Sequence, residues 1–382
     1  MKQMGLMIPF LLGTTMGFAM ADSSLEEIVQ TRVAGDRSGV CVAVARVGTA
    51  VETAFVCADP EQARAIDDDS RFEIGSLSKA LQGVLIARLV EQEKLDLDLT
   101  LADVLGESVP RFAEQPIRLR HLLTHTSGLP RVPAGMPMSD PANPYADLTA
   151  EHLLSALADT ELTTAPGERW EYSNFGTMLL SLAIARHSGD DLDVLLQREL
   201  FGPLQMRNTA IGGPVIDGHD ANGNKVPGWD FATNLAGVGG IRSSLDDMVR
   251  FMQAALGQGP DAITNAIAQS FETLSNTGQP MGWGWVQVPV NEQVLMVHDG
   301  GTYGFSSFMA IDPQRGVASV VLSDTSMLSQ NSLGDLALHL IDPEVPLGAP
   351  RQQSRAAVAR PENLNVADYV GDYPLYDRSR SP

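Results

Sequence analysis

Basic side chains are scarce in this chain of 382 residues. It carries 26 Lys and Arg against 47 Asp and Glu, a formal net charge of −21 at pH 7. Because the phosphates of a nucleic acid repel so acidic a protein, we expect no nucleic-acid partner. Acidity of this kind otherwise concerns solubility rather than function.

Long apolar runs are equally scarce. The first 21 residues hold one charge, Lys2, then an apolar run and small residues at Ala19 and Ala21. This is the pattern of a signal peptide cleaved after Ala21. A retained membrane anchor is the alternative, but the run is short for a span. No later segment is long and apolar enough to cross a bilayer. We therefore expect no stable membrane insertion and a periplasmic or secreted protein.

Cysteine is limited to Cys41 and Cys57, which lie in two β-rich runs on either side of a turn at 48–50. If Val47 pairs with Val51, the antiparallel register places the two cysteines opposite each other. Export permits oxidation, so we predict a cross-strand disulfide worth about 3 kcal/mol. Two buried free thiols are the alternative.

The chain has strand patterns at both ends and helical patterns between them. A helix is expected over 22–36 and a hairpin over 39–57; GWGWVQVPV, QVLMVHDGG, SSFMAIDP and ASVVLSD supply the later strands, before the helical SLGDLALHLI. This order predicts an α/β (α+β) fold, with one antiparallel sheet, terminal helices packed on it and an inserted helical subdomain.

The predicted organisation is a signal peptide over 1–21, one catalytic domain over 22–350, and a linker with a truncated C-terminal extension over 351–382. Within the domain, residues 22–75 and 280–345 form the sheet part and residues 76–279 the helical part. The Pro-rich segment 130–147 is the kind of long loop that often lines a site.

The stretch FEIGSLSKALQGVLIARL (72–89) puts Ser76 and Lys79 three residues apart at the start of an apolar helix. Residues at this spacing share a helix face. A serine becomes a good nucleophile when a base takes its proton. Burial or a second cation lowers the pKa of lysine enough for it to be that base. The alternative is a capped helix with a solvated lysine.

Two further stretches carry candidate chemistry. In APGERWEYSNFGT (165–177), Tyr172 can relay a proton if a cation lowers its pKa, and the amide of Asn174 can bind a substrate carbonyl. In VHDGGTYGFSS (297–307), His298 is followed by glycines that let the backbone approach a ligand closely. The N–H groups of Gly301 and Ser76 would then form an oxyanion hole. A half-buried tyrosine and a plain Gly-rich turn are the alternatives.

Together, these three stretches resemble the motifs of the penicillin-recognising serine hydrolases, namely Ser-x-x-Lys, Tyr-x-Asn and Lys-Thr-Gly or His-x-Gly. HLLTHTSGLP (121–130) and GVGGIRSSLDDMVRFM (237–252) add to the likeness, which covers roughly residues 25–345. It implies a β-lactamase/transpeptidase-like fold. It also implies that Ser76 is acylated, that Lys79 and Tyr172 transfer protons in a coupled way, and that Asn174, His298, Gly300 and Gly301 bind substrate.

One departure bears on the substrate. Class C β-lactamases have Lys-Thr-Gly where this chain has His298-Asp299-Gly300. A mostly neutral histidine attracts a substrate carboxylate less than a lysine does. The likeness therefore implies an exported serine hydrolase of an ester, an amide such as a D-amino-acid peptide, or a β-lactam. A penicillin-binding sensor or a D-Ala-D-Ala carboxypeptidase that turns over slowly is the alternative.

Other readings fit the sequence less well. An α/β-hydrolase needs Gly-x-Ser-x-Gly, and the second glycine is missing after Ser76. His121 and His125 have the spacing of a zinc site, but Leu122 stands where a zincin carries its glutamate. DGHDANGN (217–224) has calcium-like oxygens without a bidentate glutamate, and we interpret it as a loop. No metal or other cofactor is expected, because the nucleophile and its bases are side chains.

Overall fold

Both ends of the chain contribute to one antiparallel sheet. The computed structural model describes residues 23–106 and 108–351. Its main sheet has six strands in the order β10-β11-β12-β13-β1-β2. These are β1 (Cys41–Val47), β2 (Val51–Cys57), β10 (Val286–Val290), β11 (Gln293–Gly301), β12 (Ser306–Asp312) and β13 (Val317–Ser323). The pairing of β1 with β13 joins the N-terminal hairpin to the C-terminal strands, so the predicted sheet is confirmed.

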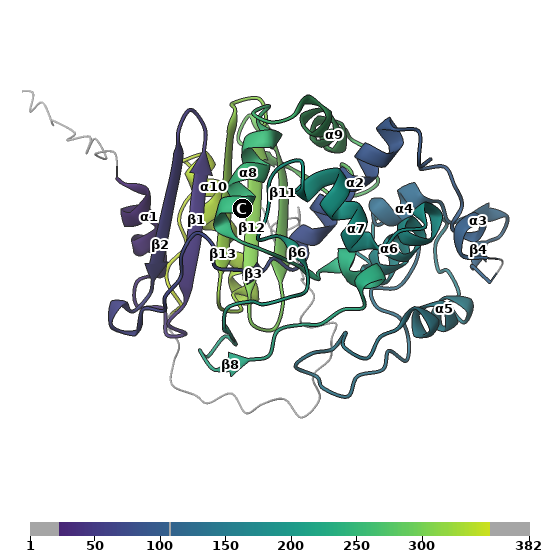
Figure 1. Cartoon of the computed structure of the whole chain (residues 1–382), viewed down its shortest axis with the longest axis horizontal. Helices are drawn as coiled ribbons and strands as arrows, with labels where there is room; N and C mark the ends of the chain where they lie inside the picture. Colours follow the sequence, from purple (N-terminus) through teal and green to yellow (C-terminus); the bar gives the residue numbers. More distant parts are fainter. Residues whose placement is uncertain (1–22, 107, 352–382) are drawn as a thin grey trace, which may run out of the picture.

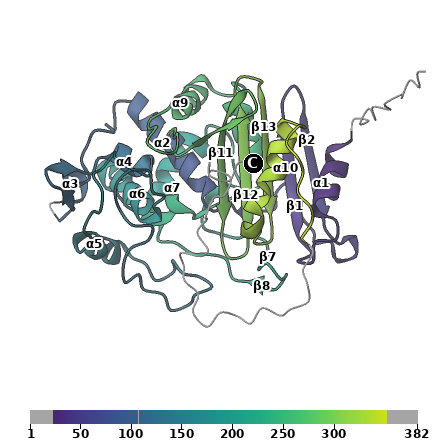
Figure 2. The same ribbon diagram turned by 180° about the vertical axis from the view of Figure 1, so that it is seen from behind.

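Helices cover both faces of this sheet. The terminal helices α1 (Leu25–Val33) and α10 (Gly334–Ile341) pack on one face, as predicted (Figure 2). Helix α8 (Leu245–Ala255) lies on the opposite face, against β1 and β13 (Figure 1). The expected signal peptide (1–21) lies outside the described residues, as does the C-terminal extension apart from Arg351.

The alternation of side chains along the strands separates two cores. On β1, Val42 and Val44 belong to the core under α1 and α10, whereas Ala43 and Ala45 belong to the larger core on the helical side. Successive side chains of a strand point to opposite faces, so a strand that is apolar at every position is buried on both faces. Burial on both faces explains why strands such as β12 and β13 are recognisable in the sequence as apolar runs.

The remaining helices gather at one side of the sheet, beside β11 (Figure 1). They are α2 (Leu77–Glu91), α3 (Leu101–Leu105), α4 (Leu119–Leu123), α5 (Ala150–Ala158), α6 (Asn174–Ser188), α7 (Leu192–Leu196) and α9 (Asp261–Phe271). Helix α2 is buried on almost every side, between β11, α9 and the 3-10 helix η3 (Thr233–Val238). A helix that is apolar all round needs such a central place.

Short strands complete the helical side. One small sheet has the order β3-β9-β6, from β3 (Phe72–Glu73), β9 (Ile241–Ser243) and β6 (Ala210–Ile211), and β4 (Arg111–Phe112) pairs with β5 (Gln115–Pro116). The segment 217–224 takes part in a hairpin of β7 (Gly218–His219) and β8 (Lys225–Val226), rather than a plain loop. The Asp220 carboxylate accepts hydrogen bonds from the backbone N–H groups of Asn222 and Asn224, which is turn chemistry.

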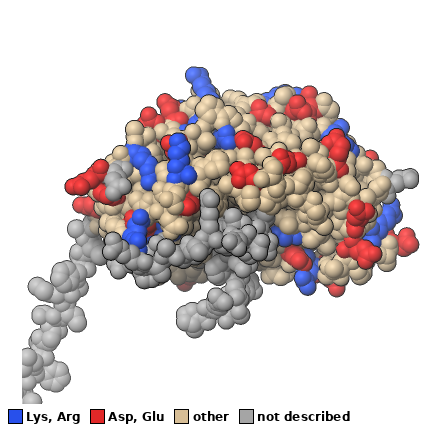
Figure 3. All heavy atoms as spheres, turned by 90° about the horizontal axis from the view of Figure 1, so that it is seen from below, with Lys and Arg blue, Asp and Glu red and all other residues tan. Residues whose placement is uncertain are grey.

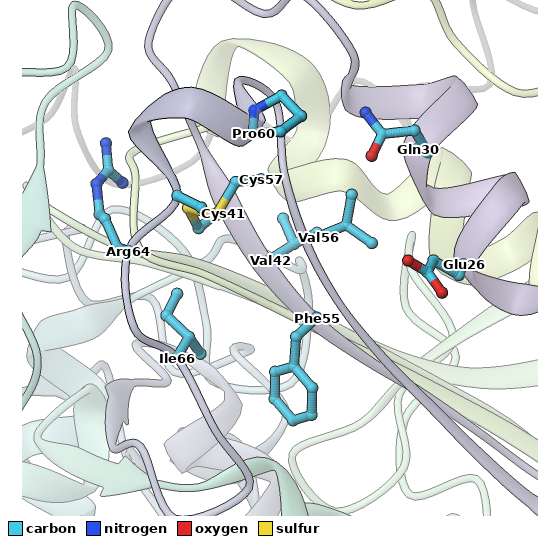
Figure 4. A pocket seen from close by; sticks show the side chains of 11 residues that line it. Glu26, Gln30, Cys41, Val42, Phe55, Val56, Cys57, Pro60, Arg64 and Ile66 are labelled. Atoms are coloured by element: carbon cyan, nitrogen blue, oxygen red, sulfur yellow. A yellow bond between two sulfur atoms is a disulfide. The ribbon is translucent and has the colours of Figure 1, made fainter.

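The predicted disulfide is confirmed. Val47 faces Val51 and Cys41 faces Cys57 in the β1–β2 register, and the two sulfur atoms are bonded. Figure 4 shows the disulfide in the wall of a pocket that Phe55 and Ile66 also line. The bond fastens the edge strand β2 to its neighbour β1.

The distribution of surface charge and the apolar character of the helices can be examined in the structure. On the face shown in Figure 3, acidic and basic side chains are interspersed outside the grey atoms. Within residues 23–106 and 108–351, none of the helices has the length and apolar character needed to cross a membrane.

Candidate active site

Ser76 lies where the small β3 strand turns into α2. Gly75 takes a positive φ of 51° at this turn, which a residue with a side chain rarely adopts. Ser76 is already in a helical conformation, and its carbonyl accepts a hydrogen bond from the Lys79 N–H. The two side chains therefore share one face, and Lys79 Nζ lies 2.8 Å from Ser76 Oγ. The sequence predicted this proximity from the spacing alone.

Lys79 is buried, with 3% of its surface exposed. Burial, reinforced by the positive charge of Arg131, holds the pKa of its amine well below the usual value; Asp299 acts in the opposite direction. Its Nζ also donates to the carbonyl of Val238 at 2.6 Å. A neutral amine in this place keeps a lone pair for the proton of Ser76, so Lys79 can act as a general base.

Tyr172 reaches the same serine from the start of α6. Its hydroxyl donates to Ser76 Oγ at 2.9 Å, and Lys79 Nζ lies 5.0 Å from the centre of its ring. The side chain of Ser173 caps α6 by accepting from the Gly176 N–H. The cap fixes where the chain enters the helix and thereby places Tyr172. The structure thus brings together the three side chains that the sequence analysis singled out for chemistry.

Asn174, on the other side of the cap, contacts the loop 130–147. Its Nδ2 donates to the hydroxyl of Tyr145 at 3.2 Å, while its Oδ1 is buried without a hydrogen-bond partner among the described residues. Tyr145 in turn stacks on Phe231 at 4.8 Å between ring centres. Since a phenol both donates and accepts, the same contact permits either orientation of the Asn174 amide, and the free end can bind substrate.

The third stretch ends β11 against the start of α2. A Cβ atom on Gly300 would lie 2.0 Å from the carbonyl oxygen of Ile74, and one on Gly75 would lie 2.5 Å from the Gly301 nitrogen. Glycine is required at both positions because backbone packs on backbone there. The amide of Gly301 and the nucleophile segment are therefore neighbours, as the expected oxyanion hole requires.

His298 is buried and neutral. Its Nδ1 lies 2.6 Å from the carbonyl oxygen of Asp299; because a carbonyl only accepts, Nδ1 carries the proton. Its Nε2 is a buried acceptor without a partner among the described residues. Burial is the main cause that lowers the pKa of His298 to about 3, and Lys79 acts in the same direction whenever it is protonated. His298 therefore carries even less positive charge than the mostly neutral histidine that the sequence predicted.

Sequence reasoning missed three charged or titratable side chains around the site. The guanidinium carbon of Arg131 lies 5.3 Å from the centre of the Tyr172 ring. The ring of His125 lies 4.4 Å from the same ring, and burial keeps its pKa well below the usual value. Burial raises the pKa of Asp299 to about 7. The Pro-rich loop and the His-x-Gly stretch were the available signals, but neither specifies these contacts.

The histidine pair considered for zinc has backbone partners instead. His121 Nδ1 accepts from the Arg118 N–H, and His125 Nδ1 accepts from the Ser173 N–H. Over the described part of the chain, no group of three or more His, Cys, Asp or Glu side chains is arranged to hold a metal ion.

Comparisons with known proteins agree with this geometry. The family model Beta-lactamase matches residues 25–339. A crystal structure of a Beta-lactamase/D-alanine Carboxypeptidase from Yersinia pestis, complexed with citrate, superimposes with a TM-score of 0.68 at 25% identity, over 83% of this chain and 99% of that chain. The chain therefore belongs to the beta-lactamase family. The predicted membership of the penicillin-recognising serine hydrolases and the predicted fold are confirmed.

Two curated relatives are similar in sequence. The D-alanyl-D-alanine-carboxypeptidase/endopeptidase AmpH of Escherichia coli (strain K12) is 29% identical over 283 residues, which are 69% of this chain and 73% of AmpH. Protein flp of Staphylococcus aureus (strain MW2) is 27% identical over 280 residues, 67% of this chain. The match spans about half of flp, 53% of its length.

Proposed function

We propose that this chain is an exported serine hydrolase that forms an acyl-enzyme on Ser76. One observation carries the proposal: Ser76 Oγ lies 2.8 Å from Lys79 Nζ and 2.9 Å from the Tyr172 hydroxyl. Two proton-transfer groups on one hydroxyl are the arrangement that activates a serine. No added cofactor enters this chemistry.

The proposed reaction has two halves. Ser76 Oγ attacks the substrate carbonyl carbon while its proton passes to Lys79 Nζ, and the oxyanion is held by the N–H groups of Ser76 and Gly301. The bond to the leaving group then breaks, and the leaving oxygen or nitrogen takes the proton that Lys79 accepted, passed on through Tyr172. In the second half, water attacks the acyl carbon and gives a proton to the same pair. The pair returns a proton to Ser76 Oγ as its bond to the acyl carbon breaks, which releases the acid and free Ser76.

Export has two supports. Residues 1–21 have the pattern of a signal peptide, and the cysteines of β1 and β2 form a disulfide. Disulfides persist in oxidising compartments such as the periplasm. We therefore assign the protein to the periplasm or the extracellular medium. Fractionation of cells that express the full chain tests this, because processed protein in the cytoplasm would contradict it.

An ester, a D-amino-acid peptide and a β-lactam are the substrate classes proposed. His298 carries no charge with which to attract a carboxylate, which favours an ester over substrates that carry a carboxylate, such as a β-lactam or a D-alanyl-D-alanine peptide. Purified protein assayed side by side with nitrocefin, p-nitrophenyl butyrate and a D-alanyl-D-alanine peptide tests this. Turnover of at least one supports the proposal, and no turnover of any overturns it.

A D-Ala-D-Ala carboxypeptidase is the second candidate. It is favoured by the AmpH relative and the Yersinia structure, whose names include this activity. Release of D-alanine from the peptide, at a rate above that for the ester, would establish it. A penicillin adduct that persists for hours, with no turnover of ester or peptide, would instead indicate a sensor.

A further inference from the structure

The proton-transfer groups around Ser76, Lys79 and Tyr172, would both be helped by a nearby positive charge. His298 is neutral and offers a bare nitrogen acceptor. Lys79 must itself be neutral to act as a base. An unprotonated lysine and a tyrosine that releases its proton are both favoured by a nearby fixed cation. Arg131 lies against the Tyr172 ring and acts electrostatically on Lys79.

Arg131 is held there by the backbone. The carbonyl of Arg131 accepts a hydrogen bond from the Phe175 N–H at 3.1 Å, and the carbonyl of Pro130 accepts from the Ser173 hydroxyl at 2.7 Å. Both bonds fasten the start of the 130–147 loop to the capped end of α6, the segment that also carries Tyr172. The backbone of Arg131 is thus fixed relative to Tyr172, and its guanidinium carbon lies 5.3 Å from the centre of the phenol ring.

We propose that Arg131 is a positioning residue that supplies the fixed cation of this site, keeping Lys79 as a free amine and favouring proton release by Tyr172. The inference rests on the proposed acyl-enzyme function. An arginine suits the role because it remains charged at every working pH, whereas a second lysine would itself titrate. The positive charge of Arg131 is the second-largest cause, after burial, of the lowered pKa of Lys79.

Other titratable groups face Lys79 and are included in the test: Tyr172, His125, His298 and Asp299. Both histidines are uncharged at neutral pH, because burial keeps the pKa of each well below the usual value. Asp299 titrates at about pH 7, and its carboxylate raises the pKa of Lys79. An Asp299→Asn background removes that contribution and isolates the effect of Arg131.

The test is the pH dependence of kcat/KM on a neutral ester, p-nitrophenyl butyrate, for wild type, Arg131→Met and Arg131→Lys. A base must be deprotonated to work, so a raised pKa of Lys79 moves the acid limb to higher pH. We expect a shift of about one pH unit or more in Arg131→Met, hence a roughly tenfold lower rate on that limb. Arg131→Lys should restore much of it, and the shift should recur in the Asp299→Asn background.

Arg186→Met, at the exposed far end of α6, is the matched control and should follow the wild-type profile. Superimposable profiles for Arg131→Met and wild type would overturn the inference. So would a variant that only raises KM for a carboxylate-bearing peptide, since Arg131 would then bind substrate. If Arg131→Met does not fold, Arg131→Gln replaces it. A wild type inactive on every substrate refutes the proposed function instead.

Discussion

The Tyr172 hydroxyl donates a hydrogen bond to Ser76 Oγ at 2.9 Å, although 96 residues separate the two in the sequence. Ser76 directly precedes the long buried helix α2, and Tyr172 lies two residues before the long buried helix α6. The hydrogen bond therefore depends on how the N-terminal ends of these two helices are packed against each other. Anything that shifts one helix end against the other should disturb the chemistry before it disturbs the core.

Ser76→Ala should abolish turnover and leave the fold intact, because it removes the attacking oxygen and a few atoms of packing. Ser78→Ala is a matched control two residues along the same helix. Ser78 Oγ accepts a hydrogen bond from the Ile241 N–H, so its loss should cost about 1 kcal/mol of stability while turnover continues. Assays and thermal melting of both variants check this, and wild-type rates in Ser76→Ala on every substrate would refute the nucleophile.

Gly75→Ala should damage the site far more than Gly35→Ala does. Both glycines have a positive φ, so both substitutions carry backbone strain of about 1–2 kcal/mol. At Gly35 a Cβ meets nothing within 4 Å, whereas at Gly75 it would lie 2.5 Å from the Gly301 nitrogen. We expect kcat to fall about a hundredfold or more in Gly75→Ala, as when an oxyanion donor is lost. Equal kinetics in the two variants would contradict the proposed oxyanion hole.

Replacing both cysteines by serine should lower stability by about 3 kcal/mol, the value for a loop of this size. The disulfide joins β1 to the edge strand β2, away from Ser76, so kcat below the melting transition should not change. Denaturant unfolding of the oxidised protein and of the double variant measures the difference. A loss of activity that precedes unfolding would show that β2 supports the site.

His298→Asn should make the protein less sensitive to acid. The folded pKa of His298 is about 3, against an ordinary value of 6.5. Between these values the unfolded chain binds a proton that the folded chain excludes, so stability falls as pH falls through this window. Asparagine removes this proton uptake and keeps an N–H for the Asp299 carbonyl. From pH 7 to pH 4 the variant should lose up to about 3 kcal/mol less stability than wild type; equal losses in denaturant titrations would contradict burial of the neutral ring.

The local relationships were predictable from the sequence. Ser76 and Lys79 follow from helix geometry, and Cys41 opposite Cys57 follows from the register of one hairpin. The approach of Tyr172 depends on packing between distant helices, and only the resemblance to a family indicated it. Arg131 and Asp299 were missed because their influence is electrostatic and acts between loops and strands that no periodicity connects.

The most direct measurement is mass spectrometry of protein quenched in acid during turnover of p-nitrophenyl butyrate. The account predicts a butyryl group on the peptide that contains Ser76, formed at the rate of the burst of p-nitrophenol and missing from Ser76→Ala. Steady turnover without any acylated peptide, or with the acyl group on another side chain, would contradict the central claim.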